Sequence, residues 1–83
     1  MAADSGSIAY NLKVTSSPPG ALISYHRRGD PPHTYAERTN ATISSLPYAM
    51  LYVRIEKEGY RAEEREYDPY HDPTHEIDFQ LQR

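Results

Sequence analysis

The stretch Leu12–Ala21, LKVTSSPPGA, and the stretch Leu46–Tyr60, LPYAMLYVRIEKEGY, decide the fold of this 83-residue chain. In both stretches apolar residues alternate with polar ones, which is the period of a β-strand with one buried face. The first stretch runs into the sequence PPGA at 18–21, which fits a type II turn because Pro presets φ and Gly supplies a positive φ. The second ends at Glu58-Gly59, a hairpin signal. Alternating strands that end in turn signals predict a small antiparallel β domain.

The same patterns extend over the rest of the chain. The expected strands are residues 8–16, 21–26, one or two short strands within 34–45, and then 50–57, 61–67 and 76–82. Residues 61–67, RAEEREY, have some helix propensity and no apolar face, and the hairpin interpretation makes them a charged edge strand. Short strands separated by turn signals indicate an all-β fold, a small antiparallel β-sandwich or open barrel of about six to seven strands.

Alternation also predicts which side chains form the core. The inward positions of the expected strands are occupied by large apolar or aromatic residues. The predicted core is Tyr10, Leu12, Val14, Ile23, Val53, Ile55, Ile77 and Phe79.

Composition limits the chain to one small domain. Leu, Ile, Val and Phe together account for only 13 residues, and eight Tyr add large, partly apolar rings to this thin supply. Residues 1–7, MAADSGS, are interpreted as a polar linker, or as a segment attached with a start methionine when a domain is cut from a longer chain. Residues 8–82 then form a single β domain, and the isolated domain is expected to be a monomer.

Charge and cysteine content exclude several function classes. The chain has 12 acidic and 9 basic residues, so it lacks the basic stripe that nucleic-acid binding requires. Because there is no Cys, disulfides and thiolate chemistry are excluded. Three carboxylates, Glu56, Glu63 and Glu64, lie on charged segments where nothing would raise the pKa of a general acid. The sequence therefore predicts a protein that is not an enzyme and that has no cofactor.

Several short motifs in order resemble those of the PEGA domain family. They are PPGA at 18–21, where Pro replaces the Glu of the family name, Leu46-Pro47, VRIEKEGY at 53–60, and FQL at 79–81. Ala49 stands where the family usually has Gly after Leu-Pro, which affects loop geometry more than the fold. The resemblance covers about Ile8 to Leu81.

This resemblance implies a function. PEGA domains resemble surface-layer proteins of bacteria and archaea, often lie outside the cytoplasmic membrane, and recur as accessory modules of larger chains. We therefore expect a non-catalytic, extracytoplasmic β module of a cell-envelope or surface protein, acting as a spacer or interaction domain. Its expected partners are other domains of a larger parent chain, and also cell-wall glycan or another envelope protein. The resemblance supplies no catalytic residues.

A tandem Asp-Pro-x-His motif is the weak candidate for a metal site. Asp68, His71, Asp72 and His75 lie within eight residues, and carboxylate and imidazole groups are ligands for zinc. The two prolines of the motif, however, favour turns, in which Asp accepts hydrogen bonds from the backbone. The prediction is therefore a loop without a metal.

Outward-facing tyrosines are the candidate for a ligand surface. Tyr48, Tyr52 and Tyr70 would offer apolar ring faces and hydroxyls to a sugar or a protein partner. The alternative function is therefore a glycan- or peptidoglycan-binding module. The other interpretation is that these tyrosines only cover the sheet, because Tyr is favoured in strands.

Overall fold

The computed structural model describes residues 9–83, so the expected linker at 1–7 and the first expected strand residue, Ile8, lie outside the described residues. Within this range the chain forms seven strands and no helix. The strands are β2 (Ala9–Ser17), β3 (Leu22–His26), β4 (His33–Arg38), β5 (Ala41–Pro47), β6 (Leu51–Glu56), β7 (Glu63–Tyr67) and β8 (Glu76–Gln80). Accordingly, residues 9–83 contain no helix that is long and apolar enough to cross a membrane.

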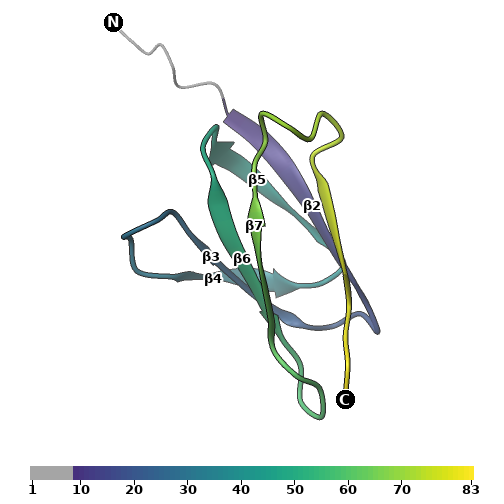
Figure 1. The fold of residues 1–83 in the computed structure, drawn as a ribbon. Helices are drawn as coiled ribbons and strands as arrows, with labels where there is room; N and C mark the ends of the chain where they lie inside the picture. Colours follow the sequence, from purple (N-terminus) through teal and green to yellow (C-terminus); the bar gives the residue numbers. More distant parts are fainter. Residues whose placement is uncertain (1–8) are drawn as a thin grey trace, which may run out of the picture.

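Two sheets pack face to face (Figure 1). One has three strands in the order β5-β2-β8, and the other has four in the order β4-β3-β6-β7. The chain crosses from one sheet to the other at four connections, β2–β3, β4–β5, β5–β6 and β7–β8, and the described strands do not join into a closed barrel. The prediction of a small all-β sandwich is confirmed.

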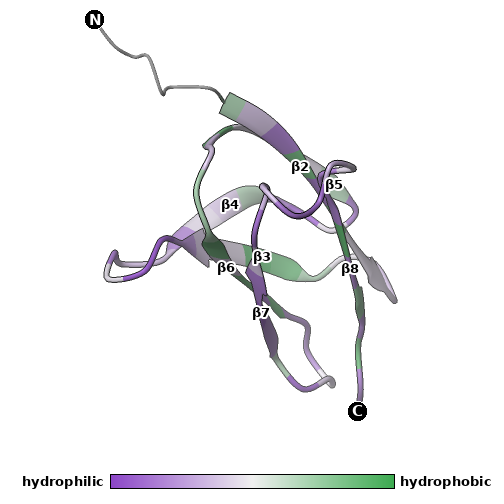
Figure 2. Ribbon diagram, turned by 45° about the horizontal axis from the view of Figure 1, so that its top comes forward, coloured by the Kyte–Doolittle hydropathy of each residue, from purple (hydrophilic) through white to green (hydrophobic). Residues whose placement is uncertain are grey.

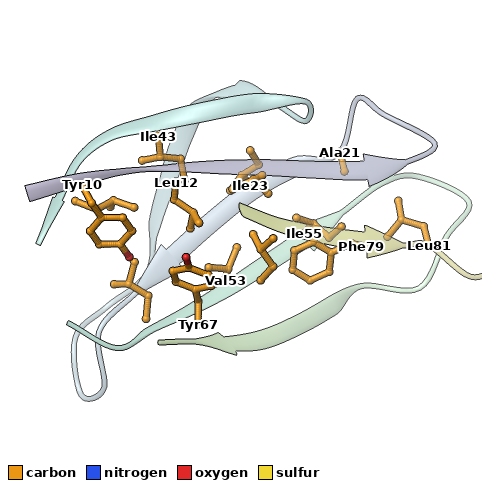
Figure 3. Close-up of a cluster of buried hydrophobic side chains, with 14 residues drawn as sticks. Tyr10, Leu12, Ala21, Ile23, Ile43, Val53, Ile55, Tyr67, Phe79 and Leu81 are labelled. Atoms are coloured by element: carbon orange, nitrogen blue, oxygen red, sulfur yellow. The ribbon is translucent and has the colours of Figure 1, made fainter. Parts of the chain in front are cut away.

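The core fills the space between the two sheets (Figure 3). All eight side chains predicted from alternation are buried. The structure adds Ala21, Ile43, Leu46, Leu51, Tyr67 and Leu81 to them. In β2 every second residue is buried from Tyr10 to Ser16, as the sequence alternates. The pairing of β2 with β5 contains one bulge, where Ser44 and Ser45 oppose Asn11. The extra residue keeps the apolar side chains on both sides of the bulge directed into the core.

Strand β7 is the predicted charged edge strand, and it is the most hydrophilic strand in Figure 2. The expectation that it has no apolar face is wrong at its end, because the ring of Tyr67 is buried. Arg65 lies on the same face of β7 and remains exposed at the sheet edge, where its guanidinium carbon is 4.7 Å from the centroid of the Phe79 ring. A cation over an aromatic face is favourable, so this edge strand closes the core as well as protecting the sheet from edge pairing.

The Pro-Pro-Gly turn is held by a buried polar residue, Thr39. Gly20 has a φ of +90°, as the turn requires, and its N–H donates to the Thr39 carbonyl at 2.7 Å. The N–H of Ala21 donates to Thr39 Oγ1 at 2.8 Å, and Ser16 Oγ lies 2.6 Å from the same hydroxyl. Thr39 lies in the connection between β4 and β5, so these hydrogen bonds fix the Pro-Pro-Gly turn to that connection.

One strand pair departs from the antiparallel expectation. Strands β2 and β8 are parallel, in register from Lys13 opposite Glu76 to Ser17 opposite Gln80. The pair is extended at both ends, because Lys13 N donates to the His75 carbonyl at 3.0 Å and Leu81 N to the Ser17 carbonyl at 3.1 Å. Since the first described strand and the last run side by side in the same direction, β2 starts at one end of the molecule and β8 finishes at the other (Figure 1).

Candidate functional site

Two of the three candidate tyrosines meet at one end of the sandwich, between the β5–β6 loop and the β7–β8 loop. Tyr48 Oη donates to the Pro69 carbonyl at 3.2 Å, and Tyr70 Oη donates to the Tyr48 carbonyl at 2.8 Å. Their ring centroids are 4.8 Å apart in an edge-to-face arrangement. We call this pair of reciprocal hydrogen bonds the tyrosine latch. It fixes the two loops to each other, and it leaves the ring of Tyr70 70% exposed.

The other expectations for these tyrosines need correction. Tyr48 does not face outward, because its ring is half-buried and packs against the core. Tyr52 does face outward, but on the outer surface of the four-stranded sheet, where its ring stacks on His26 at 5.2 Å. Tyr52 and the latch are therefore separate features, and they do not form one aromatic surface.

Sequence reasoning missed that the latch rests on further aromatic rings. The His75 ring lies 4.8 Å from the Tyr10 ring and 5.8 Å from the Tyr48 ring, and Tyr67 stacks on Tyr10 at 6.2 Å. Burial raises the pKa of Tyr10 to about 12, with further contributions from Tyr48 and Asp68. The signal for Tyr67 was available, because it falls on the inward parity of the edge strand, two residues after Arg65.

Asp68 and His71, from the first half of the tandem motif, form one pair. His71 Nδ1 donates to Asp68 Oδ2 at 2.6 Å, and the other carboxylate oxygen accepts the N–H of Tyr70 at 2.9 Å. The hydrogen bond from His71, followed by that from the Tyr70 backbone, lowers the pKa of Asp68. The imidazole itself is largely exposed. The pair therefore forms a turn whose carboxylate is occupied by two donors.

Asp72 and His75, from the second half of the tandem motif, make contacts separate from the Asp68–His71 pair. Asp72 Oδ1 accepts hydrogen bonds from the Thr74 hydroxyl at 2.6 Å and the Thr74 N–H at 3.1 Å. The bond from the Thr74 hydroxyl is the main cause that lowers the pKa of Asp72. His75 has a φ of 54°, which turns its ring under the latch, where Nε2 lies 3.4 Å from Tyr48 Oη.

The four candidate metal ligands consequently do not converge. Only Asp68 and His71 lie together, while Asp72 closes its own turn and His75 packs among tyrosines. Within residues 9–83 there is no group of three or more His, Cys, Asp or Glu side chains placed to hold a metal ion.

A hollow of about 340 Å³, which the sequence pattern does not predict, opens between the β3–β4 hairpin and strand β5. Tyr25 and His33, with ring centroids 6.0 Å apart, form one wall, and Ser44 to Pro47 form the other. The charged groups at its rim are already paired, because Arg27 Nε lies 3.2 Å from Asp30 Oδ2.

Comparison with known proteins gives one result. Among curated proteins and among solved structures, none matches the chain significantly. The profile of the PEGA domain matches residues 9–83, which is nearly the whole chain and covers all seven described strands. The match agrees with the buried alternation of β2, the Gly20 turn and the closing strand that carries Phe79. The chain therefore belongs to the PEGA domain family.

Proposed function

We propose that this domain is a non-catalytic, extracytoplasmic β module of a cell-envelope or surface protein, where it acts as a spacer or interaction domain between other parts of a larger chain. The observation that carries the proposal is the parallel pairing of β2 with β8. Since the chain enters at one end of the sandwich and leaves at the other, successive domains joined through it would lie in line. The longest dimension of the described domain is 47 Å, so one module adds a length of that order to its parent.

Membership of the PEGA family supports the extracytoplasmic location, because the resemblance implies surface-layer-like modules. The electrostatics support a non-catalytic role. A general acid at neutral pH needs a raised pKa, whereas hydrogen bonds lower the pKa values of Asp68, Asp72 and Asp78. These three carboxylates stay ionised and hold turns or strands in place.

The location is tested on intact cells that express the parent protein. Externally added protease should degrade the domain in intact cells, while a cytoplasmic marker protein survives. Protection of the domain until the cells are lysed would overturn the extracytoplasmic proposal. The purified, folded domain must first be shown to be degraded at the same protease dose, so that survival in intact cells reports a membrane barrier and not a resistant fold.

Glycan binding is the second candidate function, and the exposed ring of Tyr70 at the latch favours it. An exposed, fixed aromatic ring offers an apolar face to a sugar at low entropic cost. The test is a titration of the isotope-labelled domain with soluble peptidoglycan fragments and with a panel of glycans, followed by amide chemical shifts. Binding predicts shifts confined to the two loops of the latch, lost in Tyr70→Ala and kept in Tyr52→Ala. Unchanged spectra at millimolar ligand would exclude this function.

A further inference from the structure

We propose that the domain bears tension: its first and last described strands form a clamp that resists extension of the chain. This inference deepens the proposed spacer role, and its biological meaning rests on that role. The mechanical property itself belongs to the isolated domain and can be measured independently of any location in the cell.

The clamp follows from the direction of the two strands. A pull on the chain before Ala9 acts on β2 toward the start of that strand, and a pull beyond Gln80 acts on β8 toward its end. Because the strands are neighbours and parallel, the two forces act along them in opposite directions. The load therefore shears the ladder between the strands. Bonds of a parallel ladder are evenly spaced, so the pairs from Lys13–Glu76 to Ser17–Gln80 share the load and must yield together.

A side-chain bond crosses the same ladder. Thr15 Oγ1 donates to Asp78 Oδ1 at 2.6 Å, on the outer face of the three-stranded sheet. This bond and that from Gln80 lower the pKa of Asp78, so its carboxylate is an ionised acceptor, which makes a stronger hydrogen bond than a neutral one. The bond joins residues that lie directly opposite each other in the register, and shear would have to break it at the same moment as the backbone bonds.

The core opposes sliding as well. Val14 on β2 and Phe79 on β8 are both fully buried, and Ile77, which lies opposite Val14 in the register, is 7% exposed. Because side chains alternate between the two faces of a strand, a slip of β8 by one residue would turn Ile77 and Phe79 toward water. The register one residue away is therefore not a position in which the strand can rest while the load is applied.

The chain after β8 is fastened to the other sheet. Arg61 N, in the turn between β6 and β7, donates to the Gln82 carbonyl at 2.7 Å. Arg83 donates through Nη2 to Tyr60 Oη at 3.2 Å, and its guanidinium carbon lies 5.2 Å from the Tyr60 ring centroid. A load that arrives at the end of β8 is thus first shared with the four-stranded sheet.

Single-molecule force measurements test the clamp by comparing two directions of pull on the same domain. In the first, handles are attached before residue 9 and after residue 83. In the second, both handles are on Cys residues introduced at the start of the ladder, as Lys13→Cys and Glu76→Cys, which lie directly opposite each other in the register and are the only attachment points because the chain has no other Cys. The second direction separates β2 and β8 from one end, pair by pair. We expect the unfolding force to be about twofold or more higher in the first direction, because the ladder bonds then break together.

Two matched variants separate mechanical from thermodynamic effects. Thr15→Val removes the hydroxyl that crosses the clamp, and Tyr35→Phe removes a hydroxyl that donates from β4 to the Thr42 carbonyl of β5 at 2.8 Å and does not cross the β2–β8 ladder. Each variant removes one hydroxyl donor, and we expect both to lower the melting temperature slightly. Only Thr15→Val should lower the unfolding force in the first direction.

Equal forces in the two directions would overturn the proposal, and so would an equal loss of force in the two variants. Neither outcome would bear on the extracytoplasmic location, which protease accessibility decides separately. Conversely, a domain found to be protected inside cells would leave a measured clamp intact and would remove only the proposed spacer role.

Discussion

Phe79→Ala is the most informative single substitution, because Phe79 is the only Phe in the chain and its side chain is completely buried between the sheets. Its ring is also the one that the Arg65 guanidinium covers, with the guanidinium carbon 4.7 Å from the ring centroid. Truncation of a buried Phe to Ala typically costs about 3–5 kcal/mol, the sum of the lost transfer free energy and the cavity that remains. At roughly 0.05–0.15 kcal/mol per residue, a domain of this size has about 4–11 kcal/mol of total stability. The variant should therefore lose a large part of its stability, and all of it if the parent lies at the low end of this range.

Urea denaturation followed by circular dichroism measures this effect. With a slope of about 1 kcal/mol/M, as expected for a small domain, the midpoint should fall by about 3 M or more. Gln80→Ala is the matched control on the same strand, because Gln80 is exposed and ordinary surface substitutions change stability by about 0.5 kcal/mol at most. If Phe79→Ala and Gln80→Ala had the same midpoint, the assignment of the inward face of β8 would be refuted.

Four other predictions concern the end loops, the turn and the titrating groups. His71→Ala should change stability by about 0.5 kcal/mol or less, whereas His75→Ala should cost about 1 kcal/mol because its ring packs on two tyrosines. Zinc should leave the melting temperature of both variants and of the unmodified domain unchanged. An increase with zinc in the unmodified domain alone would show that the loop is a metal site. Gly20→Ala should destabilise by about 1 kcal/mol or more in thermal melts, because its φ of +90° strains any residue with a Cβ; an unchanged melting temperature would argue against the turn. The pKa of Asp78 is lower in the folded state, so its contribution to folding stability is complete above the unfolded pKa of about 3.9 and is lost as pH falls through the folded pKa. In thermal melts at decreasing pH, the melting temperature of Asp78→Asn should decline less than that of the parent. The pKa of Tyr10 is raised to about 12 in the folded state, so its contribution to folding stability is complete below the unfolded pKa of about 10 and is lost as pH rises toward the folded pKa. Between these two pH values Tyr10→Phe should unfold less readily than the parent, as followed by tyrosinate absorbance.

The sequence predicts the faces of the strands better than their partners. Alternation places Leu12, Val14 and Phe79 in the core because a period of two residues is a local property that burial of one face enforces. The parallel pairing of β2 with β8 is not local. The Thr15–Ile77 contact spans 62 residues, and period-two alternation is the same whether the neighbouring strand runs in the same or the opposite direction.

The candidate site was predicted less well, for a related reason. Tyr48 lies in a loop, where alternation does not apply, and its burial depends on the β7–β8 loop, which contacts it through Pro69. His75 and Asp68 belong to the same short motif, yet the positive φ of His75 sends its ring away from the carboxylate. Residue types and spacing indicate which groups are available in such a loop, but the direction of each side chain is set by backbone angles that sequence leaves open.

The parallel pairing of β2 with β8 also determines when the domain can fold during synthesis. β2 lies in the middle of its sheet, and one of its two neighbours is the last strand of the described chain. A ribosome therefore releases nearly the whole sequence before the three-stranded sheet is complete and before Phe79 can enter the core. Contacts of such long sequence separation make folding slow, because the chain must close a long loop before it gains their energy. The nascent domain accordingly emerges with one side of β2 unpaired, and it acquires its stability in a single late step.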